Sequence, residues 1–469
     1  MAKTNQNSFA VLILAAGQGV RMKSSKPKVL HKICGKPMIY YTIKVAKMLN
    51  PSEIFVVTGF GSKDVAQEIK KFGVRSIVQE EQLGTGHAVK ISIPCIKDFD
   101  GLLLLYGDMP LIKSTDLDLL LQDFWVTGSS VSVLSTVVKP PSDFGRIVRS
   151  SKGEFAAIVE ELDATPEQCR IGEVNTGIYC FGISDLLDVL EEINNKNAKG
   201  EYYITDCVNM LRKRGKKVSI IVAPDSTNFI GINSRVHLAQ ANAVMRGEIC
   251  ERLMDSGVTI LGPATTYIDD EVEIGQDTII YPDTHITGQT RVGSDCVIGP
   301  NTFVSDSVIG NRTTITYSVV KGAEVMDDCN VGPYSHLRPG SVVMKGGKVG
   351  SFCEIKKSVI REGAKVPHLS YVGDADIGAN ANIGAGTITC NYDGFNKHKT
   401  VIGEGSFIGS DTMLVAPVRI GKNATTGAGS VISRDVPDGA LAIERSDQKN
   451  ILEWDKVREK KAEKRLKKG

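Results

Sequence analysis

The stretch "YIDDEVEIGQDTIIYPDTHITGQTRVGSDCVIGPNTFVS", residues 267–305, places an aliphatic residue at every sixth position. These residues are Ile268, Ile274, Ile280, Ile286, Val292, Ile298 and Val304. A period of six matches neither the 3.6-residue period of a helix nor the alternation of a simple strand. It is typical of a parallel β-helix, in which each hexapeptide supplies one short strand and one turn and points its aliphatic residue inward.

The same period returns twice toward the C-terminus after changes of phase. The second run is Val325, Val331, Leu337, Val343, Val349 and Ile355, and the third is Ile402, Ile408, Leu414, Ile420, Thr426 and Ile432. Three hexapeptides close one triangular coil, so this span predicts roughly nine coils. Glycine often follows the aliphatic residue, as at Gly275, Gly293, Gly299, Gly350, Gly403, Gly409 and Gly421. The plain alternative is that the β-helix is only a scaffold, because a fold does not fix a function.

The N-terminal half has a different pattern, in which short apolar runs alternate with helix-like stretches from Phe9 to about Ile230. The apolar runs are FAVLILAAG, EIFVVTG and GLLLLYGD, and helices are expected near residues 37–49 and 63–71. This alternation predicts a Rossmann-like, doubly wound α/β domain with a mostly parallel sheet. Ligands of such sheets bind beyond the carboxyl ends of the strands.

Length and charge limit the class of protein. A chain of 469 residues exceeds one hydrophobic core and predicts two or three domains. A formal charge of +2 gives no general basic field for nucleic acid or membranes. The ten cysteines form no CxxC pair, no signal-peptide pattern is present, and the apolar runs are far shorter than the ~20 residues of a membrane span. We therefore expect a cytoplasmic protein with no nucleic-acid partner and no membrane insertion.

The predicted domain bounds follow these patterns. We expect the α/β domain at 1–232, a connecting helix at 233–257, the β-helix at 258–445 and a basic tail at 446–469. Asn233 or Ser234 could cap the connecting helix. From Asp455 onward the tail has eight Lys and Arg residues against three Asp and Glu residues. This composition favours a solvated, partly helical end over a nucleic-acid arm.

A glycine-containing basic loop follows the first apolar run: "LAAGQGVRMKSSKPKVLHKICGKP", residues 14–37. It lacks the GK[ST] of a Walker A loop, and Arg21 stands where the dinucleotide fingerprint requires glycine. Its glycines still allow backbone N–H groups to approach a phosphate, and Arg21 with Lys28 can neutralise a polyphosphate. Asp108 follows four leucines and would reach the same sheet edge, where an Asp beside a polyphosphate can bind Mg²⁺. The plain alternatives are a solvated basic turn and a helix cap.

Several longer motifs carry a resemblance to a known family. They are residues 14–37, QEEQLGTGHA (79–88), GDMPL (107–111), FGRI (144–147), IVEELDAT (158–165) and NTGIY (175–179). They resemble sugar-1-phosphate nucleotidylyltransferases, and the hexapeptide half resembles the acyltransferases with a left-handed β-helix, which usually form trimers. Together, from about Ala10 to Arg445, the chain resembles the bacterial bifunctional family that joins an N-acetylglucosamine-1-phosphate uridylyltransferase to a glucosamine-1-phosphate N-acetyltransferase.

The resemblance implies a set of roles in the α/β domain. UTP and UDP-N-acetylglucosamine would contact Leu14, Ala15, Gly17, Lys28, Gln79, Gly84 and Thr85, with Arg21 and Lys28 acting in catalysis on the phosphates. Asp108 and Asn233 would coordinate Mg²⁺, and Gly145, Glu160, Asn175 and Thr176 would line the sugar-phosphate pocket. For Asn233, the role of a helix cap remains an alternative.

A second candidate site lies where the hexapeptides are interrupted by TCNYDGFNKHKTV, residues 389–401. Loops that leave a regular scaffold often carry function. His368 and Tyr371 precede this insertion, and Glu354 lies about one coil before His368. Acyl transfer to an amine needs a base near neutral pH, and imidazole is suited to that role. An isolated histidine in a turn is otherwise most often a structural hydrogen-bonding residue.

For this second site, the resemblance implies that His368 is the base and that Glu354 orients it. Glucosamine-1-phosphate would contact Arg338, Lys356, Tyr371, Asn382 and Lys397. Acetyl-CoA would contact Ala385, Asn391, Tyr392, Ser410, Ala428 and Arg445, of which Asn391 and Tyr392 would also line the sugar-phosphate pocket. Glu444 stands beside Arg445 where a small residue is expected.

The resulting prediction is a two-site enzyme of UDP-N-acetylglucosamine synthesis for cell-wall polymers. It would acetylate glucosamine-1-phosphate with acetyl-CoA and then transfer a uridylyl group from UTP, with Mg²⁺ as cofactor, as a homotrimer. One rival is a nucleotidylyltransferase whose β-helix only oligomerises or regulates it, which His368 and the insertion argue against. The other rival is an inactive scaffold, which the intact Arg21, Lys28 and Asp108 argue against.

Overall fold

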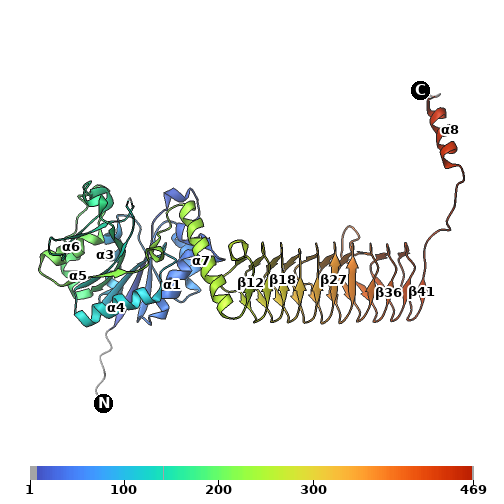
Figure 1. The fold of residues 1–469 in the computed structure, drawn as a ribbon, viewed down its shortest axis with the longest axis horizontal. Coiled ribbons are helices and arrows are strands. Elements are labelled where there is room, and N and C mark those ends of the chain that lie inside the picture. Colours follow the sequence, from blue (N-terminus) through green and yellow to red (C-terminus); the bar gives the residue numbers. More distant parts are fainter. Residues whose placement is uncertain (1–7, 141, 467–469) are drawn as a thin grey trace, which may run out of the picture. The chain divides into compact units, whose positions relative to one another are not determined.

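The computed structural model describes residues 8–140 and 142–466 (Figure 1). It divides into two compact units, Met1–Ile249 and Cys250–Gly469. The division falls within helix α7 (Arg235–Asp255), which covers most of the predicted connecting helix. The domain bounds derived from the sequence stay predictions.

The first unit is an α/β domain built on one mixed sheet. Its strand order is β11-β7-β10-β6-β1-β4-β5, with β8 and β9 attached beside β10. The strands are β1 (Phe9–Ala15), β4 (Glu53–Thr58), β5 (Arg75–Val78), β6 (Gly101–Tyr106), β7 (Val131–Val137), β8 (Arg146–Arg149), β9 (Phe155–Val159), β10 (Glu173–Gly182) and β11 (Val218–Ala223). The neighbours along β6-β1-β4-β5 and the pair β7-β11 are parallel. Strand β10 runs antiparallel between β6 and β7, so the predicted α/β class is confirmed with one reversed central strand.

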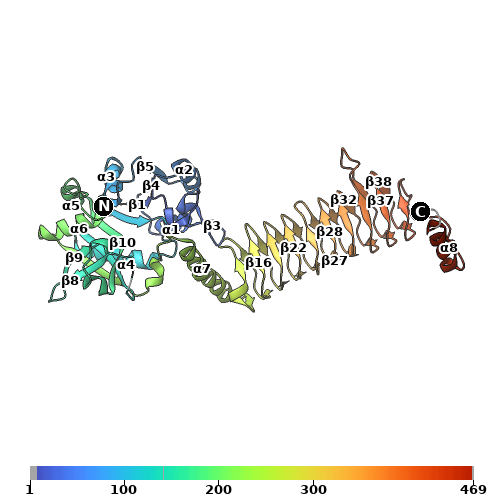
Figure 2. The same cartoon turned by 90° about the horizontal axis from the view of Figure 1, so that it is seen from above.

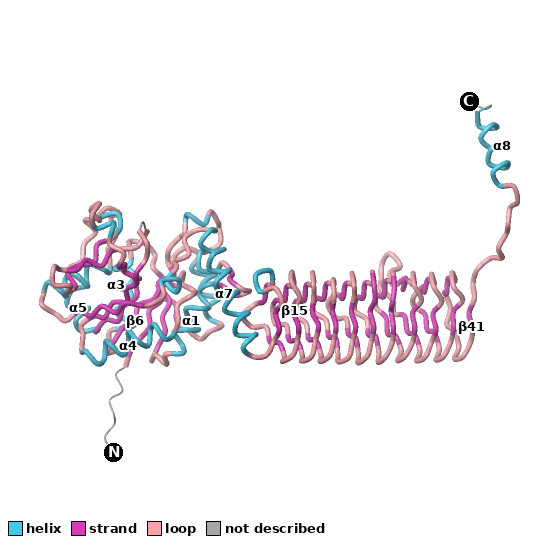
Figure 3. Tube along the Cα trace, viewed as in Figure 1, coloured by secondary structure: helices cyan, strands magenta, loops and turns pink. Residues whose placement is uncertain are grey.

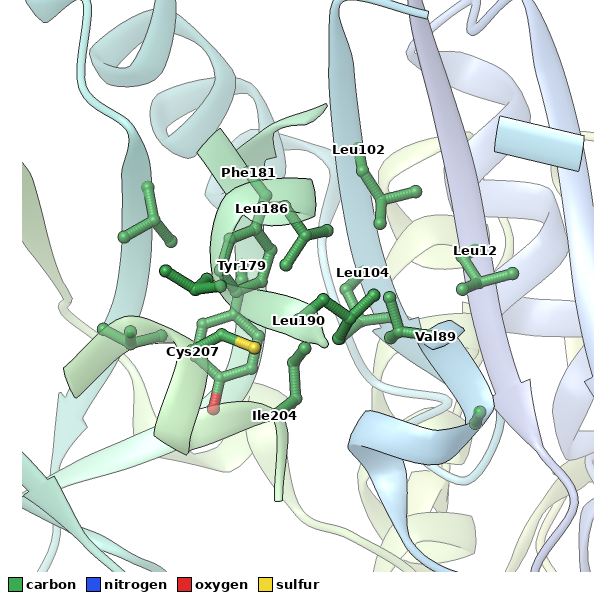
Figure 4. Packing of buried hydrophobic residues seen from close by; sticks show 14 of the residues in the cluster. Leu12, Val89, Leu102, Leu104, Tyr179, Phe181, Leu186, Leu190, Ile204 and Cys207 are labelled. Carbon is green, nitrogen blue, oxygen red and sulfur yellow. The ribbon is translucent and has the colours of Figure 1, made fainter. Parts of the chain in front are cut away.

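The helices of this unit cover both faces of the sheet. They are α1 (Met38–Met48), α2 (Ser62–Lys70), α3 (Thr85–Ile96), α4 (Ser114–Thr127), α5 (Ile183–Leu190) and α6 (Ile204–Lys213). Alternate residues of β1 enter two different apolar clusters, with Leu12 in one and Ile13 in the other. Figure 4 shows the first cluster, in which Leu12 and Leu104 pack near Val89 and Leu190. Burial on both faces explains why the sequence of β1 is a continuous apolar run.

The basic loop leaves β1 at its carboxyl end. It forms two short 3₁₀ turns, η1 (Val20–Met22) and η2 (Lys28–Leu30), and a small hairpin of β2 (Lys32–Ile33) and β3 (Lys36–Pro37). Strands β1 and β6 are parallel neighbours with Leu14 in register with Tyr106. Gly107 and Asp108 therefore begin beside the loop, at the sheet edge that the sequence predicted.

The second unit is a left-handed parallel β-helix, which confirms the prediction from the six-residue period. Its three sheets run along the stack of coils (Figure 3). The first sheet contains β12 (Thr259–Ile260), β15 (Ile279–Ile280), β18 (Val297–Ile298), β21 (Thr314–Ile315), β24 (Asn330–Val331), β27 (Lys348–Ser351), β30 (Lys365–His368), β33 (Asn382–Ile383), β36 (Phe407–Ile408), β39 (Thr425–Thr426) and β41 (Leu441–Ala442). The second contains β13 (Tyr267–Ile268), β16 (His285–Thr287), β19 (Phe303–Ser305), β22 (Val319–Lys321), β25 (His336–Leu337), β28 (Glu354–Lys356), β31 (Tyr371–Gly373), β34 (Ile388–Cys390), β37 (Met413–Val415) and β40 (Val431–Ile432). The third contains β14 (Glu273–Ile274), β17 (Arg291–Val292), β20 (Val308–Ile309), β23 (Glu324–Val325), β26 (Val342–Val343), β29 (Val359–Ile360), β32 (Ala375–Ile377), β35 (Thr400–Ile402) and β38 (Val418–Ile420).

The aliphatic residues of the repeat fill the interior of the coils. Ile280, Ile298 and Leu337 are completely buried, whereas Ile274, in the first coil, is only half-buried. The phase changes in the sequence come from shorter coils. Val292 pairs with Ile309 and Val304 pairs with Val320, which are 17 and 16 residues further along the chain.

The tail ends in an exposed helix, α8 (Trp454–Leu466). This agrees with the partly helical, solvated end that its composition favoured. Among the residues that the structure describes, no helix is both long and apolar enough to span a membrane.

The glycines that follow the aliphatic residues allow neighbouring coils to approach closely. A Cβ atom on Gly403 would lie 2.6 Å from the backbone nitrogen of Lys422, and one on Gly409 would lie 2.6 Å from that of Ala428. Backbone of the next coil cannot move aside locally, because it is held in the parallel sheet.

We expect Gly403→Ala to destabilise the β-helix by about 1–3 kcal/mol through this contact with backbone. The measurement is urea unfolding followed by circular dichroism. The matched control is Gly247→Ala in helix α7, where a Cβ atom meets nothing within 4 Å and alanine favours the helix. Equal midpoints for the two variants would contradict this explanation of the glycine pattern.

Candidate active sites

A cavity of about 260 Å³ lies at the carboxyl ends of β1 and β6. Its lining includes all of the predicted nucleotide-binding residues: Leu14, Ala15, Gly17, Lys28, Gln79, Gly84 and Thr85. Asp108 also lines it. Gly17 has open space where a Cβ atom would stand, so its backbone faces the solvent of the cavity directly. These residues come from three separate parts of the chain and meet only in the fold.

Lys28, Asp108 and Asn233 form one cluster, of which Lys28 and Asp108 line this cavity. The Lys28 ammonium makes an ion pair with Asp108, and the side chains of these two residues are 13% and 15% exposed. The ammonium also donates a hydrogen bond of 3.0 Å to Asn233 Oδ1. A carboxylate and an amide oxygen are hard donors of the kind that Mg²⁺ binds. Among the described residues, no group of three or more His, Cys, Asp or Glu residues that could hold a metal occurs.

Arg21 is placed differently from the other predicted phosphate-binding residues. It lies on η1, is well exposed, and its guanidinium pairs with Asp143 at 3.4 Å. It does not line the cavity that contains Lys28. The structure therefore does not bring Arg21 to the other nucleotide-binding residues.

Tyr106 is a cavity residue that the sequence interpretation missed. It is the last residue of β6, and its hydroxyl shares a hydrogen bond with Thr85. Burial, with smaller contributions from Glu160 and Asp108, raises the pKa of Tyr106 well above its usual value, so the phenol stays protonated. A Cβ atom on Gly177 would lie 2.8 Å from the Tyr106 ring, and Gly177 has φ +85°. Both the close contact and the backbone conformation therefore require glycine there. Its position directly before Gly107 and Asp108 was the signal that could have identified it.

Three of the four predicted sugar-phosphate residues lie together. The Asn175 backbone nitrogen donates to the Gly145 carbonyl at 2.9 Å, and a Cβ atom on Gly145 would lie 3.6 Å from Glu160 Oε2. Glu160 accepts a hydrogen bond of 3.0 Å from the Thr205 hydroxyl, and burial raises the pKa of its carboxyl. The fourth residue, Thr176, is buried and donates its hydroxyl to the Leu134 carbonyl at 2.6 Å. Its side chain thus supports the sheet.

The second candidate site combines residues of the first and second sheets of the β-helix. His368 is the last residue of β30 and is exposed, with its backbone in register with Ser351. Tyr371 begins β31 on the adjacent sheet and is in register with Glu354. Among the hydrogen bonds of the described residues, none joins Glu354 to His368. The Glu354 carboxylate instead accepts a bond of 2.9 Å from Arg338, so its predicted role in orienting His368 stays a prediction.

The insertion leaves the coils between β34 and β35 (Figure 2), and a cationic cluster lies beside it. Lys356 Nζ is 3.7 Å from Asp374 Oδ2, and their side chains are 12% and 21% exposed. The same carboxylate oxygen accepts a hydrogen bond from the Asn391 amide. The ammonium of Lys356 lowers the pKa of Lys397, which shows that two lysines face each other here. Two adjacent ammonium groups are well suited to a phosphate.

The predicted acetyl-CoA residues form a column along the turns that follow the first sheet. Ala385, Ser410 and Ala428 follow β33, β36 and β39. The Ala385 carbonyl accepts from Asp411 N at 2.7 Å, the Ser410 carbonyl accepts from Gly429 N at 2.8 Å, and the Ala428 carbonyl accepts from the Arg445 side chain at 2.9 Å.

Two further predicted residues lie beside this column and in the insertion. Asn382, on β33, is in register with Lys365 and Phe407. Tyr392 is exposed and forms an isolated antiparallel bridge with Lys397 across the insertion.

Comparison with known families defines the class of the two units. Residues 11–170 match the MobA-like NTP transferase domain. Residues 271–306 and 399–434 match the bacterial transferase hexapeptide, and residues 298–382 match the GlmU-like C-terminal hexapeptide. The chain is thus a nucleotidyltransferase joined to a hexapeptide-repeat transferase.

Curated relatives extend over both units. The bifunctional protein GlmU of Carboxydothermus hydrogenoformans is 49% identical over 94% of this chain and 98% of its own length. That of Caldanaerobacter subterraneus is 48% identical over 98% of both chains, and that of Syntrophomonas wolfei is 47% identical over 94% of this chain and 99% of its own. The chain belongs to the family of the bifunctional protein GlmU, which confirms the resemblance drawn from the motifs.

The buried Glu160 makes the stability of the first unit depend on pH. The carboxyl ionises near about pH 4.3 in an unfolded chain and at a higher pH in the folded protein. The stability gained from the neutral, buried carboxyl is complete below the unfolded pKa and is lost as the pH rises through the folded pKa.

Glu160→Gln should therefore gain stability relative to the original chain as the pH is raised from 4 to 8. Urea unfolding followed by Trp125 fluorescence measures this difference, because Trp125 lies in the first unit. The control is Glu53→Gln, an exposed carboxyl on β4. A difference in midpoint that does not grow with pH would show that Glu160 is not the titrating group.

Proposed function

We propose that the chain makes UDP-N-acetylglucosamine in two steps at two separate sites. The β-helix acetylates glucosamine-1-phosphate with acetyl-CoA, and the α/β unit then transfers a uridylyl group from UTP to N-acetylglucosamine-1-phosphate, releasing pyrophosphate. The observation that carries this proposal is that a chain of the GlmU family contains two clusters that join a lysine, an aspartate and an asparagine, one in each unit. Both clusters are suited to phosphate-containing substrates.

In the uridylyl step, a phosphate oxygen of N-acetylglucosamine-1-phosphate attacks the α-phosphorus of UTP, and the bond to the pyrophosphate oxygen breaks. Two anions must approach each other, so cations are needed to reduce their repulsion. Lys28 supplies one, and Asp108 with Asn233 would hold Mg²⁺, which neutralises phosphate charge when bound. Gln79, Gly84 and Thr85 hold the base, while Gly145, Glu160 and Asn175 position the sugar. Arg21 can contact the phosphates only if its ion pair with Asp143 breaks.

In the acetyl step, the amino nitrogen of glucosamine-1-phosphate attacks the thioester carbonyl carbon of acetyl-CoA. The new N–C bond forms, the C–S bond breaks, and the coenzyme A thiolate leaves. His368 accepts the proton of the attacking nitrogen, for which its exposed ring is available. Lys356 and Lys397 bind the phosphate, Tyr371 contacts the sugar phosphate, and the Ala385–Ser410–Ala428 column holds the coenzyme.

Two features support the proposed setting of these reactions. The ten cysteines are all free thiols, which fits a reducing, cytoplasmic compartment. Exposed apolar side chains at Tyr334, Phe352 and Leu369 form a column beside His368 and are 57%, 60% and 61% exposed. The Tyr334 and Phe352 rings stack at 5.2 Å, and such an apolar strip is best covered by further copies of the chain in a trimer.

The two sites should be separable by mutation. His368→Ala should reduce acetyl transfer at least 100-fold and leave uridylyl transfer unchanged, because only the acetyl step needs an imidazole. Asp108→Ala should do the reverse, because it removes a carboxylate from the nucleotide cavity. Coenzyme A release and pyrophosphate release measure the two steps. His285→Ala, which removes an imidazole from β16, is the control, and a variant that loses both reactions while folded would refute independent sites.

The trimer is tested by charging the apolar column. Phe352→Asp should reduce the mass in solution from three times the 50.6 kDa chain to one, as measured by light scattering after gel filtration. Val308→Asp introduces the same charge at an exposed position of the third sheet and should leave the trimer intact. A trimer that survives Phe352→Asp would remove this column from the interface.

A further inference from the structure

We propose that Asp374 is a positioning residue of the acetyltransferase site: its carboxylate holds Lys356 and the Asn391 end of the insertion in place and keeps Lys356 and Lys397 together as one phosphate-binding pair. This inference rests on the proposed function of the β-helix. Sequence reasoning and family motifs gave Asp374 no role, and it touches the substrate-binding residues without belonging to them.

The backbone of Asp374 ties the insertion to the coils. Its N–H donates to the Lys356 carbonyl of the preceding coil at 2.9 Å, and its carbonyl accepts from Thr400 N at 3.2 Å. Lys356 belongs to the predicted phosphate set, and Thr400 is the first residue of β35, at the C-terminal end of the insertion. One residue thus fixes where the insertion returns to the β-helix.

The side chain of Asp374 ties the other end of the insertion. One oxygen, Oδ2, accepts the Asn391 amide and lies 3.7 Å from Lys356 Nζ. The neighbouring Gly373 leaves room for this arrangement, because a Cβ atom there would lie 2.8 Å from Asn391 Nδ2 and 2.5 Å from the Tyr371 hydroxyl. Asn391, Tyr371 and Lys356 are therefore packed around one glycine and one carboxylate.

The negative charge of Asp374 offsets the repulsion between two neighbouring lysines. Lys356 and Lys397 face each other, and without a phosphate their ammonium groups repel. Lys356 lowers the pKa of Lys397, whereas Asp374 and Tyr371 act in the opposite direction. The other Asp, His and Lys side chains of the insertion are paired elsewhere: Asp393 with His398 at 2.7 Å, and Lys399 with Asp376 at 3.7 Å. Asp374 is thus the carboxylate that favours the charged form of Lys397 by raising its pKa.

The backbone conformation limits which substitution is informative. Asp374 has φ +49°, in the left-handed region that Asp and Asn tolerate better than other non-glycine residues. Asp374→Asn therefore preserves shape and backbone and removes the charge. The matched control is Asp376→Asn, whose carboxylate is similarly shielded but pairs with Arg361 at 2.7 Å and Lys399 at 3.7 Å on the third sheet.

The experiment measures acetyl transfer by the full-length variants from pH 6 to 10, with glucosamine-1-phosphate and acetyl-CoA varied separately. Asp374→Asn should raise KM for glucosamine-1-phosphate about tenfold or more, with a smaller change in kcat. On the alkaline side, the rise of this KM should begin about one pH unit lower, because Lys397 loses its proton more readily without the carboxylate. Asp376→Asn should match the original chain in both respects.

The outcomes are distinct. If the original chain does not acetylate glucosamine-1-phosphate, the proposed function of the β-helix fails. If it does, and Asp374→Asn matches Asp376→Asn in KM and pH profile, the role of Asp374 is refuted. Equal loss for both substrates without a shift of the pH profile would indicate a structural role only and would also refute it. If Asp374→Asn does not fold, Asp374→Ser, which leaves room for water beside Lys356, is measured in the same way with the same criteria.

Discussion

A shielded lysine held by an aspartate is the interaction on which both sites depend. Lys28 pairs with Asp108 in the α/β unit, and Lys356 pairs with Asp374 in the β-helix, with Asn233 and Asn391 as the respective amide partners. A cation that must bind a phosphate cannot be left alone in a half-buried position, because removal from water is costly for a single charge. A carboxylate offsets this cost before the substrate arrives and orients the ammonium.

The two scaffolds reach this arrangement by different routes. In the α/β unit, the parallel strands β1 and β6 end side by side. The basic loop after β1 and Asp108 after β6 therefore lie close together. In the β-helix, paired positions on successive coils without an insertion are 16 to 18 residues apart, so Lys356 pairs with Gly373 and the next residue, Asp374, lies beside it. Regular backbone thereby fixes the distances between charged side chains that are remote in the sequence.

Each site also relies on glycines for close contact. Gly177 leaves room for the Tyr106 ring at the cavity of the α/β unit, and Gly373 leaves room for Tyr371 and Asn391. In the coils themselves, Gly403 and Gly409 let one turn lie directly on the next. A side chain at these positions would collide with backbone or with another side chain. These glycines are therefore required for close packing and not only for turns.

The periodic features could be predicted from the chain alone: the six-residue repeat predicted the β-helix, and alternating apolar runs predicted the α/β unit, because these patterns are imposed by burial of one face or one interior. Motifs also indicated Lys28, Asp108 and Lys356 as candidate residues. The folded structure was needed to show that Arg21 stands apart with Asp143, that Thr176 supports the sheet, that Tyr106 lines the cavity and that Asp374 joins two ends of an insertion. These placements depend on contacts between distant segments, and such contacts leave no local period in the chain.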